Sequence, residues 1–137
     1  MDAALRVLVR KRAGDRCEYC HLPQEFSELH FHIEHVVPRQ HGGTEAPENL
    51  ALACPECNFA KGPNLAALEP GGLKIVRLFN PRRDKWVQHF RSDGVHIVGK
   101  TPVGRASVTL LRMNDAERLR IRALLSDLGI LPGEMGC

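Results

Sequence analysis

The sequence predicts a small α+β domain built around a strand, a second strand and a short helix, with a metal ion holding this segment together. Two observations carry the prediction. The chain contains two cysteine pairs, each with a gap of two residues: Cys17 and Cys20, then Cys54 and Cys57. Between the pairs, apolar residues alternate around Ile33 and Leu52, which is typical of short strands, and a helix-like segment follows at Pro55. A helix before this segment, and a hairpin and helices after it, complete the expected architecture.

The length of 137 residues suits one domain, or one core unit with an added subdomain. We expect residues 1–69 to form the core, with the N-terminal helix and the cysteine pairs, and residues 70–137 to form an extension packed on it. The hydrophobic content of 43% and the charged content of 26% are ordinary for a globular protein. A formal charge of +3 is too small to identify a partner by itself.

Nothing in the sequence indicates a membrane protein. No apolar run approaches the roughly 18 residues that a membrane-spanning helix needs. Arg6, Arg10 and Lys11 interrupt the first apolar stretch, which argues against a signal peptide. We therefore expect a cytoplasmic protein without a membrane partner.

The cysteine pairs predict a zinc site. A disulfide framework is the alternative, but the chain shows no export signal, and a two-residue gap suits a metal-binding knuckle. One such pair is weak evidence, whereas two pairs supply the four thiolates of a tetrahedral structural zinc. Binding of the ion would stabilise a region whose own core is small. The lone Cys137 near the terminus is expected to take no part.

An amphipathic helix is predicted from Asp2 to about Ala13. Leu5 and Val9 recur at helical spacing among basic residues, and Gly14 ends the pattern. The basic face either contacts phosphate or only keeps the helix soluble.

A strand is predicted next, in the segment that Pro38 ends. Apolar residues at positions 31 and 33 alternate with His32 and Glu34, so His32 and Glu34 share one face of the strand. Gly42 and Gly43 then predict a flexible turn.

Further along the chain, Leu50 and Leu52 predict a second strand, and Pro55 to about Lys61 predicts a helix that ends before Gly62. The remaining elements are predicted from turn and capping residues. In chain order they are a helical turn over 64–68, a strand over 73–79, a hairpin of strands 86–90 and 95–98, a helix after Thr101-Pro102, and a last helix with a capping box of Asn114 and Glu117.

Glu34 and His35 together suit the hydrolysis of a phosphodiester. That reaction needs a base to deprotonate water and a positive charge to neutralise the phosphate. An imidazole can take the proton while a carboxylate holds a divalent cation. The amide oxygen of Asn58 is a second hard ligand, suited to Mg²⁺ or Mn²⁺.

These motifs together resemble the HNH nuclease family, in the branch whose ββα-metal (His-Me finger) site is held by a four-cysteine zinc. The resemblance covers residues 17 to 61. It rests on the following order: Cys17-x-x-Cys20, Glu34-His35-x-x-Pro38, Gly42-Gly43, Asn49-Leu50 and Cys54-x-x-Cys57-Asn58-x-x-Lys61.

The resemblance implies a role for each matching residue. His35 would be the general base, and Glu34 and Asn58 would bind the catalytic cation. Asn49 would hold the loop that orients His35. Glu34 stands where many members of the family have Asp, which puts the details of coordination in question. Strand alternation, not the resemblance, brings in His32: on the face of Glu34 it is an additional ligand, a phosphate donor, or a residue without a role in the site.

Each of these residues also has a purely structural interpretation. His35 could be a hydrogen-bonded core histidine, and Glu34 could only pair with an arginine. Asn49 and Asn58 could be turn or cap residues.

Basic residues near the site are interpreted as DNA contacts, with simple solvation as the alternative. The candidates are Arg39, Lys61, Arg82 and Arg83. Trp86 beside them either stacks on a base or packs the hairpin onto the core.

We therefore expect an HNH-type endonuclease acting on double-stranded DNA, with structural Zn²⁺ and catalytic Mg²⁺, Mn²⁺ or Ni²⁺. The alternative is a zinc-dependent module that binds nucleic acid or acts as an adaptor without turnover. Because no helix has an obvious base-reading face, a protein partner or a homodimer is a further possible source of specificity.

Overall fold

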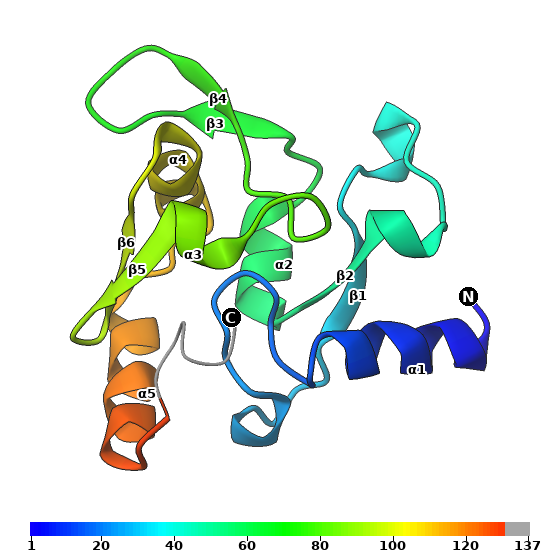
Figure 1. Cartoon of the computed structure of the whole chain (residues 1–137), viewed down its shortest axis with the longest axis horizontal. Coiled ribbons are helices and arrows are strands. Elements are labelled where there is room, and N and C mark those ends of the chain that lie inside the picture. Colours follow the sequence, from blue (N-terminus) through cyan, green and yellow to red (C-terminus); the bar gives the residue numbers. More distant parts are fainter. Residues whose placement is uncertain (131–137) are drawn as a thin grey trace.

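The computed structural model describes residues 1–130, so Cys137 lies outside the described part of the chain. Short helices and short antiparallel strands make up this part, which confirms the predicted α+β class (Figure 1). The elements are α1 (Ala3–Arg12), β1 (His32–His35), β2 (Leu50–Ala53), α2 (Pro55–Lys61), β3 (Ala66–Leu68), β4 (Ile75–Arg77), α3 (Trp86–His89), β5 (Phe90–Asp93), β6 (His96–Gly99), α4 (Pro102–Leu110) and α5 (Ala116–Asp127). No helix among these residues has both the length and the apolar character needed to cross a membrane.

The described strands form antiparallel pairs: β1 with β2, β3 with β4, and β5 with β6. In the first pair His35 lies opposite Leu50 and His32 lies opposite Ala53. Strand β2 leads through Cys54 directly into α2. The predicted unit of two strands and a helix is therefore present at the predicted residues.

Helix α1 is attached to this unit by its basic side chains. Asp2 caps the helix by accepting a hydrogen bond from the amide of Leu5 at 2.8 Å. Arg10 donates to the carbonyl of Phe31 at 2.9 Å, and Arg12 donates to the carbonyl of Leu50 at 2.7 Å. Part of the basic face is thus engaged with the ends of β1 and β2.

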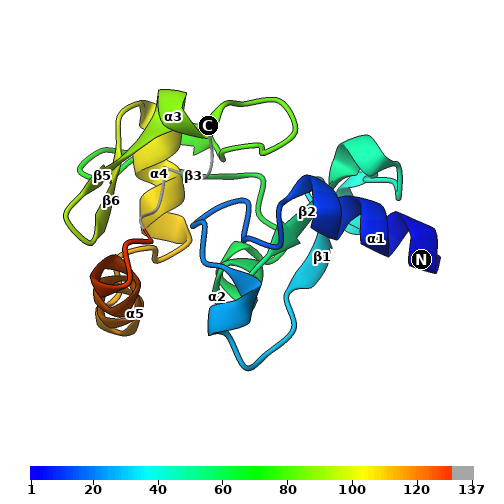
Figure 2. The same cartoon turned by 60° about the horizontal axis from the view of Figure 1, so that its bottom comes forward.

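One hydrophobic cluster joins the two parts of the chain. Its members from the first part include Val9, Phe31 and Leu52, and those from the second part include Trp86 and Met113. Both views place α2 between the β1–β2 pair and helices α4 and α5 (Figures 1 and 2). The predicted division between residues 69 and 70 falls in the connection between β3 and β4, and it remains a prediction.

Two predicted elements were wrong in type. Residues 66–68 form strand β3 instead of a helical turn, because they pair with β4 across the turn that contains Gly71. Residues 86–89 form a helical turn instead of a strand. The indole of Trp86 is buried there and donates to the carbonyl of Tyr19 at 2.7 Å, so a tertiary contact decides the local conformation.

The two C-terminal helices are present where they were predicted, but only one of the predicted caps is correct. The hydroxyl of Thr101 accepts from the amide of Gly104 at 3.0 Å and caps α4. The side chain of Asn114 instead bonds the main chain of Ile97, at 2.9 and 2.8 Å, so α5 begins after Asp115.

Candidate active site and metal centre

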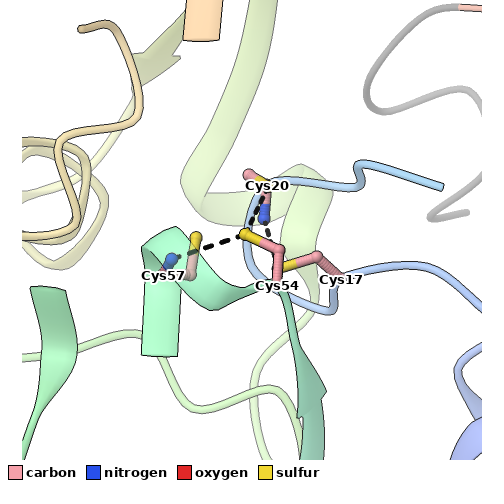
Figure 3. A group of neighbouring side chains, drawn as sticks. All are labelled: Cys17, Cys20, Cys54 and Cys57. Atoms are coloured by element: carbon pink, nitrogen blue, oxygen red, sulfur yellow. Dashed lines mark hydrogen bonds between the residues drawn. The ribbon is translucent and has the colours of Figure 1, made fainter. Parts of the chain in front are cut away.

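The four paired cysteines converge on one point, as predicted (Figure 3). Their sulfur atoms all lie within 4.8 Å of one another, and Sγ of Cys20 is 3.7 Å from Sγ of Cys54. For a Zn–S bond of about 2.3 Å, a tetrahedron has an edge of about 3.8 Å. All four side chains are buried and none forms a disulfide. The cluster is therefore compatible with a structural zinc.

Local backbone geometry orients the sulfurs. The amide of Cys20 points at Sγ of Cys17 across 3.5 Å, and the amide of Cys57 points at Sγ of Cys54 across 3.4 Å. Cys54 is also the N-cap of α2, and Pro55 occupies the first helical position. The two-residue gap thus lets each knuckle direct an N–H group at its first sulfur.

A half-buried arginine from the C-terminal helix touches the cluster. Arg118 donates to Sγ of Cys57 at 2.9 Å and lies 3.8 Å from Sγ of Cys54. Burial lowers the pKa of Arg118, but the charges of Cys20, Cys57 and Cys54 outweigh it and raise this pKa above its usual range. The guanidinium is therefore a fixed positive charge beside the sulfurs.

Glu34 lies on the inner face of β1, and its side chain is buried. The hydroxyl of Tyr19 donates to Oε1 of Glu34. Nζ of Lys61 lies 3.8 Å from Oε2, close enough for an ion pair. Burial raises the pKa of Glu34 to about 7, although Lys61 and the Tyr19 hydrogen bond act in the opposite direction.

His35 ends strand β1 and is partly buried. Its Nε2 is buried without a hydrogen bond to any described residue, and it lies 4.0 Å from Oε1 of Glu45. Glu45 is in turn hydrogen-bonded to Arg39. A carboxylate that the sequence did not point to thus stands beside the imidazole.

Asn49 holds the loop that follows His35. Its Oδ1 accepts from the amide of Val37 at 2.9 Å, while its Nδ2 donates to the carbonyls of Val37 and Thr44 at 3.0 and 2.8 Å. Main-chain bonds add to this, from Val36 to Asn49 at 2.8 Å and from Gly43 to Pro38 at 3.0 Å. The path of the chain after His35 is therefore fixed on both sides.

Gly43 is required at this point by close packing. A Cβ atom at this position would lie 1.6 Å from the carbonyl oxygen of Val37 and 2.9 Å from Nδ2 of Asn49. No other residue fits without moving the loop.

The predicted site residues of β1 and α2 share one hollow of about 370 Å³. Its lining includes His32, Glu34, His35, Arg39 and Asn58. Within residues 1–130, the four cysteines are the one group of three or more His, Cys, Asp or Glu side chains close enough to hold an ion. The hollow thus brings the predicted residues together, although its His32, Glu34 and His35 do not form such a group.

Comparison with known proteins agrees with this geometry. Residues 17–64 match the HNH endonuclease family. We refer to this matched segment as the HNH domain. The chain is also similar to the Septu protein PtuB of Bacillus thuringiensis, with 23% identity over 117 residues, or 84% of this chain. The match spans 43% of the length of that protein, and no solved structure matches the chain.

The basic residues predicted to contact DNA, two inside the HNH domain and two after it, differ in their surroundings. The Arg39 side chain is 70% exposed, whereas that of Lys61 is 2% exposed and faces Glu34. Arg82 is paired with Glu18, and Arg83 is exposed. Trp86 is buried and stacks on His21 with ring centroids 4.2 Å apart, so it packs the core and offers no face to a base.

The sequence analysis missed three residues at or beside the site: Tyr19 and Glu45 within the HNH domain, and Arg118 outside it. Tyr19 carried one usable signal, since it lies between two zinc-binding cysteines and is the chain's only tyrosine. Glu45 is brought beside His35 by the loop that follows β1, and Arg118 is brought beside Cys57 by α5. No local sequence pattern predicts either contact.

Proposed function

We propose that the HNH domain is a metal-dependent endonuclease that hydrolyses phosphodiester bonds in double-stranded DNA. The observation that carries the proposal is that His35, Glu34 and Asn58 line one hollow, next to a loop that Asn49 fixes. A base, a carboxylate and an amide oxygen are the groups this hydrolysis requires.

His35 is assigned the role of general base. Its Nε2 is buried and lies 4.0 Å from Oε1 of Glu45, so we assign proton acceptance from the attacking water to Nδ1. A neutral imidazole is needed for this step. The fixed loop from Val36 to Asn49 limits rotation of the chain next to it.

Glu34 and Asn58 are assigned to the catalytic cation, with His32 at the rim of the same hollow as an additional ligand. When bound, Mg²⁺, Mn²⁺ or Ni²⁺ would neutralise the charge that grows on the phosphate and on the leaving oxygen. Oxygen donors from a carboxylate and a carboxamide suit such ions. Zn²⁺ at the four cysteines would hold β2 and α2 in place around the hollow.

Exposed cations around the hollow would contact the DNA backbone. Arg39 lines the hollow itself, and Arg83 is exposed on the neighbouring loop. Such contacts position the substrate without selecting a sequence. We propose a protein partner or a second copy of this chain as the source of specificity.

A plasmid-nicking assay with Mg²⁺, Mn²⁺ or Ni²⁺ tests the proposal. We expect wild type to convert supercoiled plasmid to nicked or linear DNA, and His35→Ala to lose this activity while keeping zinc and DNA binding. His96→Ala, which removes an exposed histidine from β6, is the matched control. Equal cutting by His35→Ala contradicts the assignment. Binding of DNA by wild type without cutting in any of the metals favours the non-catalytic module.

A further inference from the structure

Tyr19 connects the cysteine cluster to the candidate active site. It lies between Cys17 and Cys20 in the first knuckle, and its side chain is 1% exposed. Its hydroxyl donates to Oε1 of Glu34, at the opposite end of the ring from the knuckle backbone. The same residue therefore belongs to the first cysteine knuckle by its main chain and contacts the Glu34 carboxylate by its hydroxyl.

The position of Tyr19 is fixed by contacts on both sides. Its carbonyl accepts from the indole of Trp86 at 2.7 Å, and its ring meets Phe79 edge to face with centroids 6.2 Å apart. The preceding Glu18 exchanges two hydrogen bonds with Leu52 of β2, at 2.9 and 2.8 Å. The phenol cannot move away from Glu34 without disturbing the core.

Lys61 lies beside the other carboxylate oxygen at ion-pair distance, and its buried Nζ makes no hydrogen bond to a described residue. It is the last residue of α2, the helix that begins directly after Cys54, and its Nζ is 3.8 Å from Oε2 of Glu34. Both side chains of this pair are less than a tenth exposed. Tyr19 belongs to the first cysteine knuckle, and Lys61 ends the helix that carries the second knuckle. Each knuckle therefore positions one of the two residues that contact the Glu34 carboxylate.

We propose that Tyr19 and Lys61 are positioning residues, which hold Glu34 in the orientation that the catalytic cation requires. This inference rests on the proposed nuclease function. An ionised carboxylate has about four acceptor sites, so a hydrogen bond from Tyr19 and an ion pair with Lys61 leave capacity for a cation. Partners of a ligating carboxylate fix its rotamer, and their loss typically weakens metal binding by a factor of about 10 to 100.

The first experiment compares Mn²⁺ binding by the zinc-loaded full chain and its Tyr19→Phe variant. Electron paramagnetic resonance of free Mn²⁺ gives the dissociation constant without any cutting. We expect this constant to rise about tenfold or more in Tyr19→Phe, with zinc content unchanged. Ser107→Ala is the matched control, because it removes another buried hydroxyl, one that accepts from the amide of Phe79 at 2.8 Å.

A second measurement keeps the full hydrogen-bonded structure. Tyr19 is the chain's only tyrosine, so 3-fluorotyrosine incorporated throughout the protein labels this site alone. We expect its fluorine resonance to shift as Mg²⁺ is added, and this response to disappear in Glu34→Gln.

The outcomes separate this inference from the proposed function. If wild type binds Mn²⁺ and cuts DNA, while Tyr19→Phe keeps its zinc and binds Mn²⁺ equally well, the positioning role is wrong and the nuclease assignment stands. The positioning role is also contradicted if the fluorine chemical shift does not change at Mg²⁺ concentrations that support DNA cutting. If wild type neither binds Mn²⁺ nor cuts, both proposals fail.

Discussion

The guanidinium of Arg118 donates a hydrogen bond to Sγ of Cys57 across 2.9 Å, although 61 positions separate the two residues. Arg118 belongs to α5, and Cys57 belongs to α2 of the HNH domain. Four thiolates around a divalent zinc carry a net negative charge, and an adjacent, half-buried cation offsets it. The C-terminal helix is therefore joined to the metal centre by charge as well as by packing.

Arg118→Met is expected to weaken zinc binding by a factor of about 10 to 100, because the sulfurs lose a charged hydrogen-bond donor. Competition with a chromophoric chelator measures the change. Arg120→Met is the control on the same helix, since Arg120 is exposed and pairs with Glu117 at 2.6 Å. Equal zinc affinity in Arg118→Met and wild type would show that the contact does not stabilise the centre.

Replacing one zinc-binding cysteine is expected to unfold the HNH domain. Binding of a structural zinc supplies roughly 10 kcal/mol or more to folding in small domains, which exceeds the net stability of many of them. Cys57→Ala should therefore lose its cooperative melting transition in circular dichroism, and a strong chelator should do the same to wild type. Cys137→Ser is the control, and it should melt like wild type. A folded Cys57→Ala protein without zinc would contradict the structural role.

The unit of two strands and a helix could be predicted because its determinants are local. Each cysteine pair forms a knuckle within its own turn, and Pro55 and Gly62 mark the ends of α2. Hydrophobic alternation identified both β1 and β2, although β1 ends at His35, before the Pro38 that was expected to stop it. The convergence of the four sulfurs was predictable because one tetrahedral zinc needs four ligands, and each cysteine pair supplies two of them.

Contacts between distant segments could not be predicted in the same way. The contact between the hydroxyl of Tyr19 and Glu34 depends on two tertiary arrangements: the pairing of β1 with β2, and the packing of the first knuckle on β2. Lys61 was expected near phosphate, but the fold buries it against Glu34. Asparagine is a favourable N-cap residue, yet the side chain of Asn114 forms hydrogen bonds with the main chain of Ile97 in β6 instead. In each case a tertiary partner competes successfully with a local one.

Gly43→Ala is expected to reduce DNA cutting strongly while changing overall stability less. The added Cβ would lie 1.6 Å from the carbonyl oxygen of Val37, so the loop after His35 must shift, and small displacements of a catalytic group can lower the rate about a hundredfold. Initial rates of plasmid nicking measure the effect, alongside a thermal melt.

Gly72→Ala provides the comparison for this variant. Gly72 has no φ in the left-handed region, and the nearest atoms to an added Cβ lie at 3.9 Å, so the substitution should be tolerated. Wild-type nicking by Gly43→Ala would mean that the loop's path is not needed for the reaction.

Asn49→Ala is expected to destabilise the domain by about 2 kcal/mol and to abolish cutting. The substitution removes one accepted and two donated hydrogen bonds, at 2.9, 3.0 and 2.8 Å, each with a net worth of about 1 kcal/mol, partly recovered by water. Denaturant unfolding of the zinc-loaded protein measures the stability, and plasmid nicking measures the activity.

Asn49→Asp separates the two halves of this network. An aspartate still accepts from the amide of Val37, but it cannot donate to the carbonyls of Val37 and Thr44, and its charge repels those oxygens. If the two hydrogen bonds that Asn49 donates to Val37 and Thr44 orient His35, Asn49→Asp should lose cutting nearly as completely as Asn49→Ala. DNA and zinc binding should be retained. Full cutting by Asn49→Asp would confine the role of Asn49 to the single bond it accepts from Val37.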